Sequence, residues 1–186
     1  MNPLNKQKIL KLAIDIITDE TRENEKLINS WVSAFSTVVG RTDILYVSQV
    51  AVKPIADMMG SKNSLQRRKL GNRLVVEMAK AIGEEGMDEE PRVMQLIQSM
   101  CYDTNYKIRL DGAEFFKDYI TANFAKLMES DQWDNVYLAE LFELLGDEET
   151  YVRMDAIEGC TAILDKIDEK SIEEEFMPNL FKAFKI

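Results

Sequence analysis

The sequence predicts an all-α protein in which antiparallel helix pairs stack into an α-α superhelix. Apolar residues recur with helical spacing along all 186 residues, whereas the alternation typical of strands is hard to find. In addition, the segments Asp103–Glu114 and Asp147–Glu158 share one pattern of aspartate, β-branched residue, arginine, long apolar residue, aspartate and glutamate. A helical pattern with a period near 40 residues is typical of stacked helix pairs. We expect about four pairs and an unpaired last helix in one domain, 1–186.

The first half of the chain predicts two pairs, at residues 4–40 and 42–83. Their expected helices are Leu4–Ile17, Arg22–Val39, Ile44–Met59 and Leu65–Ile82. Gly40 ends the second of these helices, and breaker residues separate the third from the fourth. The apolar positions assigned to the inner faces include Leu4, Leu12 and Leu27.

The second half predicts pairs at 91–122 and 131–167 and a half repeat at 171–186. Their expected helices are Pro91–Tyr102, Lys107–Thr121, Val136–Leu145 and Tyr151–Ile167. Gly83–Glu90 is expected to be an acidic loop before a proline that opens a helix. Residues 122–131 fit either a longer helix or a connection. Ser171 and Glu174 form a capping box that is expected to open the last helix.

The composition is acidic, with a net charge of -10 and a pI near 4.7. This balance disfavours broad binding to nucleic acid or to an anionic membrane surface, since both require clustered Lys and Arg. No apolar run approaches the roughly 20 residues that cross a bilayer, and the N-terminal residues lack the apolar core of a signal peptide. We expect a cytoplasmic protein with no nucleic-acid or membrane partner.

Histidine is absent from the chain. Catalytic triads, His-Cys dyads and zinc sites that use histidine are therefore excluded. Cys101 and Cys160 fall on apolar helix faces, which predicts reduced thiols in the core and neither a disulfide framework nor a metal cluster. We expect no catalytic residues, no metal and no cofactor, and hence a protein that is not an enzyme.

The spacing of three residue types resembles the HEAT-repeat family, in which a proline kinks the first helix, an aspartate closes the turn and an arginine opens the second helix. Asp103 and Arg109 are six residues apart, as are Asp147 and Arg153. The set Pro54, Lys62 and Arg68 keeps the family spacing with lysine in place of aspartate. The resemblance covers about residues 44–186 and implies a HEAT/armadillo-like solenoid.

Within that family, Asp147–Glu158 and Cys101–Arg109 are most similar to the group that contains the scaffolding A subunit of protein phosphatase 2A and regulatory subunit 4 of protein phosphatase 4. The resemblance implies that the turns inside the helix pairs form an edge that holds catalytic and regulatory subunits. The residues that these turns offer to a protein are Asn63, Tyr106, Lys107, Glu148 and Tyr151. Exposed tyrosines favour such contacts because they bury a large area with little loss of entropy.

A second set of residues is expected to hold the repeats together. An aspartate at a turn can accept hydrogen bonds from free N–H groups at the start of the next helix, and an arginine one turn further can bridge to the aspartate of the neighbouring repeat. The residues of this structural ladder are Asp103, Arg109, Asp147, Arg153 and Arg68.

Charge is distributed unevenly along the chain. Ser61–Lys80 carries six basic residues and one acidic residue, whereas Glu129–Glu175 carries sixteen acidic and three basic residues. Arg67 and Arg73 in the basic stretch are candidates for receiving an acidic segment of a partner, whereas the simpler interpretation is a solvated outer face.

The last helix is expected to be half of a repeat. With Pro178 at the kink position, the turn aspartate would fall at Ile186. The apolar side of this helix, with Phe181 and Phe184, would then need a cover, either from further chain or from another molecule. Self-association through the last helix is one form of this expectation.

The function favoured by these observations is a non-catalytic protein-binding scaffold or regulatory subunit of a type 2A or type 4 serine/threonine phosphatase, with the catalytic subunit as partner. A HEAT adaptor of transport or cytoskeletal type is the alternative. A DNA glycosylase with a HEAT-like shape is disfavoured, since it would need a basic channel.

Overall fold

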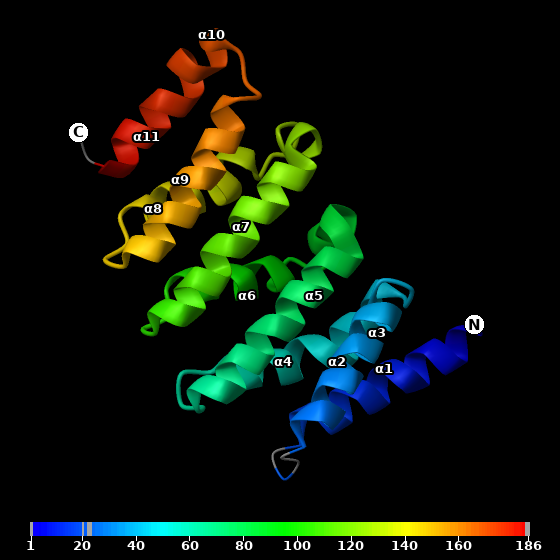
Figure 1. The fold of residues 1–186 in the computed structure, drawn as a ribbon. Coiled ribbons are helices and arrows are strands. Elements are labelled where there is room, and N and C mark those ends of the chain that lie inside the picture. Colours follow the sequence, from blue (N-terminus) through cyan, green and yellow to red (C-terminus); the bar gives the residue numbers. More distant parts are fainter. Residues whose placement is uncertain (1, 20, 22–23, 185–186) are drawn as a thin grey trace. The chain divides into compact units, whose positions relative to one another are not determined.

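The computed structural model describes residues 2–19, 21 and 24–184, and within these residues all regular structure is helical (Figure 1). The predicted all-α class is therefore confirmed. The chain divides into two compact units, Met1–Ser99 and Met100–Ile186. Neither unit contains, among its described residues, a helix long and apolar enough to span a membrane.

The first unit consists of two helix hairpins and the start of α6. Its elements are α1 (Pro3–Thr18), α2 (Glu25–Val39), α3 (Ile44–Val47), the π-type segment η1 (Ser48–Val52), α4 (Lys53–Met59), α5 (Leu65–Glu89) and α6 (Arg92–Cys101). α1 packs against α2 and α4 packs against α5, while α1 also contacts η1 and α4, and α2 contacts α5. The two hairpins of this unit thus lie side by side, first helix on first helix and second on second.

Side-chain caps fix where these helices begin. The side-chain oxygen of Asn24 accepts a hydrogen bond from the backbone N–H of Leu27, and Ser64 caps α5 in the same way at Arg67. Such caps satisfy N–H groups that have no partner inside the helix. The predicted start of the second helix at Arg22 lies outside the described residues.

The second unit contains one complete hairpin, with a helix packed on each side of it. Its elements are α7 (Tyr106–Leu127), the π-type segment η2 (Trp133–Leu138), α8 (Ala139–Leu145), α9 (Thr150–Leu164), α10 (Glu169–Ser171), the π-type segment η3 (Ile172–Phe176) and α11 (Met177–Phe184). α8 packs against α9, α9 lies against α7, and α11 contacts α8. The core of this unit contains the aromatic residues Phe115, Phe116, Tyr119 and Tyr137.

The prediction of an acidic loop at Gly83–Glu90 is wrong, because the chain remains helical to Glu89. Gly83 has a φ of 66°, a conformation that glycine adopts without steric cost, and it changes the direction of α5 without ending it. Burial of Glu84 and Met87 explains why this acidic stretch folds, since the Met87 side chain is part of the core. Similarly, α7 continues into the undecided segment 122–131 and ends at Leu127, which is fully buried.

The predicted capping box at Ser171 is also wrong. The cap is Asp168, whose Oδ1 accepts a hydrogen bond from the backbone N–H of Ser171 at 2.9 Å. Its Oδ2 accepts a second hydrogen bond from the Ser171 hydroxyl at 3.2 Å. An aspartate three residues upstream thus occupies the position that the sequence assigned to the serine.

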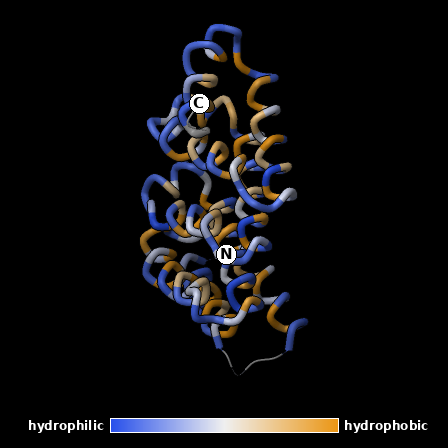
Figure 2. Tube along the Cα trace, turned by 90° about the vertical axis from the view of Figure 1, so that its left-hand side faces the viewer, coloured by the Kyte–Doolittle hydropathy of each residue, from blue (hydrophilic) through white to orange (hydrophobic). Residues whose placement is uncertain are grey.

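Three apolar residues assigned to inner faces are exposed. Leu4 is 55% exposed, Leu12 48% and Leu27 37%. In α1 the buried side is formed by Leu10, Ala13, Ile14, Ile16 and Ile17. Hydrophobic and hydrophilic residues are intermixed along the helices (Figure 2). When a helix carries more apolar residues than its buried side needs, the sequence alone does not fix which of them face the core.

Glu90 gives the first unit an acid-sensitive contact. Its side chain is buried and accepts hydrogen bonds from Nε and Nη2 of Arg92, each at 2.6 Å, while Arg92 also donates to the Ser48 hydroxyl. The Arg92 guanidinium lowers the pKa of Glu90 to about 2, against the opposing effect of burial. Glu90 therefore remains ionised through mildly acidic pH.

We expect this contact to make the stability of the first unit fall between pH 4.5 and pH 2. A depressed carboxyl pKa contributes stability above the ordinary value of 4.5, and this contribution is lost as the pH falls through the folded value of about 2. Carbon-13 NMR of the Glu90 carboxyl group measures its midpoint directly, and Glu90→Gln should remove this part of the pH dependence. A midpoint near 4.5 in the folded chain would contradict the expectation.

Candidate protein-binding site

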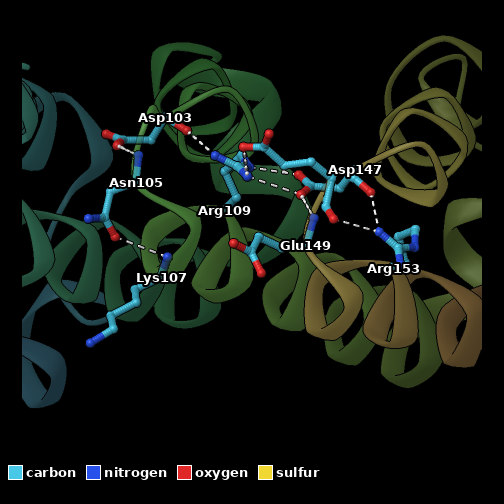
Figure 3. Close-up of polar contacts among 8 residues, drawn as sticks. Asp103, Asn105, Lys107, Arg109, Asp147, Glu149 and Arg153 are labelled. Atoms are coloured by element: carbon cyan, nitrogen blue, oxygen red, sulfur yellow. Dashed lines mark hydrogen bonds and ion pairs between the residues drawn. The ribbon is translucent and has the colours of Figure 1, made fainter.

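The two helix-pair turns of the second unit are built alike. At each turn an aspartate accepts a hydrogen bond from the backbone N–H two residues later: Asp103 from Asn105 at 2.7 Å and Asp147 from Glu149 at 2.8 Å (Figure 3). Asn105 then caps α7 by accepting from the N–H of Lys107 at 3.0 Å. These local bonds give the turns before α7 and α9 a defined conformation.

Arg109 joins these two turns. Its Nε donates to Oδ2 of Asp147 at 2.7 Å and its Nη2 donates to Oδ1 at 3.0 Å, which is a bidentate pair (Figure 3). Nη1 donates to the backbone carbonyl of Asp103 at 2.9 Å, and Nη2 also reaches Glu148 at 3.0 Å. One guanidinium therefore holds its own turn and the following turn in a fixed relation.

The pair is shielded from water, since the Arg109 and Asp147 side chains are only 10% and 8% exposed. Burial by itself raises the pKa of Asp147, but the hydrogen bonds from Arg109 and from the Glu149 N–H outweigh it and hold the pKa below its usual value. The hydrogen bond to Asp147 likewise raises the pKa of Arg109. The ion pair is therefore fully charged at neutral pH.

Arg153 repeats only half of this pattern. Its Nη1 donates to the carbonyl oxygens of Asp147 at 2.6 Å (Figure 3) and Glu148 at 2.8 Å. Its Nη2 donates to the Thr150 hydroxyl at 3.1 Å. Within the described part of the chain no carboxylate forms an ion pair with it. Arg153 thus secures its own turn and, among the residues that the structure describes, has no equivalent of Asp147.

A second link between α7 and α9 was missed by the sequence analysis. Lys117 Nζ donates to Asp155 at 2.6 Å and to Glu158 at 3.2 Å. The hydrogen bond to Asp155 raises the pKa of Lys117. The signal was present in the second aspartate and the glutamate of the repeated motif, but their cation lies on a different helix and has no fixed place in the motif.

Exposed side chains gather at the turns that Arg109 connects. Tyr151 is 66% exposed, Tyr106 36%, and the Glu148 side chain 81%. Tyr102, which the sequence analysis placed at the end of a helix, is 62% exposed. We call the set Tyr102, Tyr106, Lys107, Glu148 and Tyr151 the turn ridge.

The phenol of Tyr102 is held in its neutral form. Partial burial, followed by the nearby carboxylates of Glu140 and Glu143, raises the pKa of Tyr102 to about 12. A hydrogen bond with the Glu140 side chain contributes to this shift, so the hydroxyl is already engaged within the chain and the ring is what Tyr102 offers to a partner.

The candidates in the first unit make contacts within that unit. Asn63 donates to the carbonyl oxygens of Asp57 at 2.6 Å and Met58 at 3.1 Å and so closes the turn after α4. Its amide group is therefore committed to its own turn. Arg68 is a buried residue of α5, with 9% of its surface exposed.

The two further arginines contact neighbouring helices. Arg67 donates to the Thr18 carbonyl at the end of α1 at 3.0 Å. Arg73 is exposed and donates to the Asn29 side chain on α2 at 2.7 Å. Arg73 also lines a polar groove between α2 and α5, together with Ser33, Ser36, Thr37 and Glu77.

Comparison with known proteins finds a distant relative. No protein-family model matches the chain. Over 156 residues the chain is 22% identical to the serine/threonine-protein phosphatase 4 regulatory subunit 4 of Mus musculus. The alignment covers 84% of this chain but 17% of the mouse protein, so the chain spans less than a fifth of the length of that relative.

Proposed function

We propose that this chain is a non-catalytic protein-binding scaffold, a regulatory subunit of a type 4 or type 2A serine/threonine phosphatase. The observation that carries this proposal is the buried Arg109–Asp147 pair, which makes two exposed turns one rigid surface. The similarity to a protein named as a phosphatase 4 regulatory subunit supports the choice of partner. In this proposal residues 1–186 form one HEAT-type solenoid, which agrees with the side-by-side hairpins of the first unit.

The turn ridge is the surface that we assign to the catalytic subunit. Its tyrosines are exposed anchors on a backbone that hydrogen bonds already fix, so binding orders few additional groups. Lys107 and Glu148 add charges of opposite sign at its two turns, which favours one orientation of the partner. The function of the chain is then to hold a partner in place.

Two further features belong to the same proposal. The chain contains no histidine, the commonest general base in enzymes, and the proposal assigns its function to binding. A cytosolic location agrees with Cys101 and Cys160, which are free and buried. Burial raises the pKa of Cys160 to about 12, so this thiol is unreactive.

Titration of the purified chain with purified catalytic subunits of phosphatases 4 and 2A tests the proposal. We expect the double substitution of Tyr102 and Tyr151 by alanine to weaken binding at least tenfold, because both rings are anchors of the turn ridge. Leu45→Ala is the matched control, since Leu45 is 69% exposed but belongs to the first unit. Failure of both catalytic subunits to bind, or equal losses for the ridge and control variants, would reject the proposal.

A further inference from the structure

α9 exposes a face that the turn ridge does not use. On this face Met154 is 49% exposed, Ile157 is 53% exposed, and Thr161 is also exposed. Arg153 lies beside them, one helical turn before Ile157. Polar and apolar groups of one helix are thus left open to solvent within the second unit.

The repeat explains what kind of surface this is. Arg109, Ala113 and Lys117 on α7 correspond in the repeated motif to Arg153, Ile157 and Thr161 on α9. On α7 the Arg109 guanidinium is bound by Asp147 in the turn before α9, the Lys117 ammonium group is bound by Asp155 on α9, and Ala113 is fully buried. The exposed face of α9 therefore corresponds, position by position, to the face of α7 on which α9 packs.

The way in which α9 packs on α7 defines what such a face accepts. Asp147, in the turn before α9, forms a bidentate ion pair with the guanidinium of Arg109. Twelve residues later Gly159 lies against α7, where a Cβ atom would make an ordinary van der Waals contact, 3.5 Å from the Lys117 Cα. The matching helix thus needs an aspartate in the turn before it, and a glycine or alanine twelve positions further along fits the same approach.

We propose that the α9 face formed by Arg153, Met154, Ile157 and Thr161 binds a helix of a partner protein. In that partner the turn before the helix carries an aspartate. The carboxylate pairs with Arg153 as Asp147 pairs with Arg109, and apolar residues of the partner cover Met154 and Ile157. This surface is separate from the turn ridge and does not depend on a phosphatase partner. Two observations carry the assignment: the continuity with the α7–α9 interface, and an arginine that has its turn contacts but no carboxylate ion pair among the described residues.

A helical peptide that copies residues 146–167 of this chain is a suitable probe, since it contains the aspartate and the glycine at the required spacing. Cys160 is replaced by serine, and a hydrocarbon staple joins positions 157 and 161, which are exposed on α9 and leave the docking side free. The staple removes the cost of ordering a free peptide. With nitrogen-15-labelled chain, we expect shifts of the backbone amides at Arg153, Ile157 and Thr161.

Three variants test the register of the docked helix. Peptide with Asp147→Asn should bind at least fivefold more weakly, and so should chain with Arg153→Gln. Chain with Thr161→Lys should bind the peptide at least threefold more tightly, because the new ammonium group stands where Lys117 meets Asp155 and can receive the same carboxylate of the peptide. A surface substitution at Thr161 leaves the fold intact, so this gain separates docking from a structural effect.

The proposal is overturned if millimolar peptide shifts no amide of α9, or if shifts occur only on α7, where the peptide would exchange with the native helix. An unchanged affinity of the Thr161→Lys chain also overturns it, because the helix would then lie in another register. Light scattering that shows a dimer with these α9 amides protected from exchange would mean that a second copy occupies the face, again contrary to the proposal.

Discussion

Replacing Arg109 by methionine is expected to lower the free energy of unfolding of the unit Met100–Ile186 by about 3 kcal/mol. Methionine keeps an unbranched chain but leaves the Asp147 carboxylate, which is 8% exposed, without its guanidinium. Removing one member of a buried ion pair is costly because the remaining charge stays out of water. Urea unfolding followed by the fluorescence of Trp133, in a Trp31→Phe background, measures this loss.

Arg153→Met provides the matched control for this experiment. Arg153 occupies the same position of the repeated motif and makes the same kind of contact with its own turn, but it has no ion pair with a carboxylate among the described residues. We expect this control to lose about 1 kcal/mol, the value of ordinary hydrogen bonds. Equal losses for both arginines would show that the pair with Asp147 contributes nothing.

Gly40→Ala is expected to destabilise the first unit by about 2 kcal/mol. Gly40 ends α2 where this helix meets α5, and a Cβ atom there would lie 2.4 Å from the backbone carbonyl oxygen of Ala81. A backbone atom of a packed helix cannot rotate away as a flexible side chain can. Hydrogen exchange of the α2 and α5 amides under native conditions measures the change.

Gly146→Ala separates this clash from the general effect of removing a glycine. Gly146 ends α8 with φ and ψ of -87° and 1°, close to the values of -71° and 0° at Gly40. Its Cβ atom would meet only the Glu143 carbonyl, at 3.3 Å. We expect a change within about 1 kcal/mol, which includes the gain from a stiffer unfolded chain. A comparable loss at both glycines would contradict the packing of α2 on α5.

The sequence predicted the helix pairs because their signals are local. The six-residue interval from Asp147 to Arg153 lies within one turn and the start of one helix, where backbone geometry fixes which groups can meet. Breaker residues likewise located the turn between α4 and α5. Contacts of this kind can be predicted from the sequence because the residues that form them are close together in the chain.

Other features depend on neighbours that a single sequence does not reveal. Lys117 on α7 pairs with Asp155 on α9, and no fixed spacing in the sequence predicts a pair between two helices. Leu12 and Leu10 are equally apolar, and only the packing of α1 decides that Leu10 is buried. Gly83 appeared to end a helix, but the burial of Met87 holds the following turn in helical form.

Hydrogen exchange of the chain with and without a phosphatase 4 catalytic subunit tests the central claim most directly. Binding through the turn ridge predicts slower exchange of the amides at residues 102–107 and 148–151, with little change in the first unit. Slower exchange confined to other segments, or no change at saturating catalytic subunit, would contradict the assignment of the turn ridge as the binding surface.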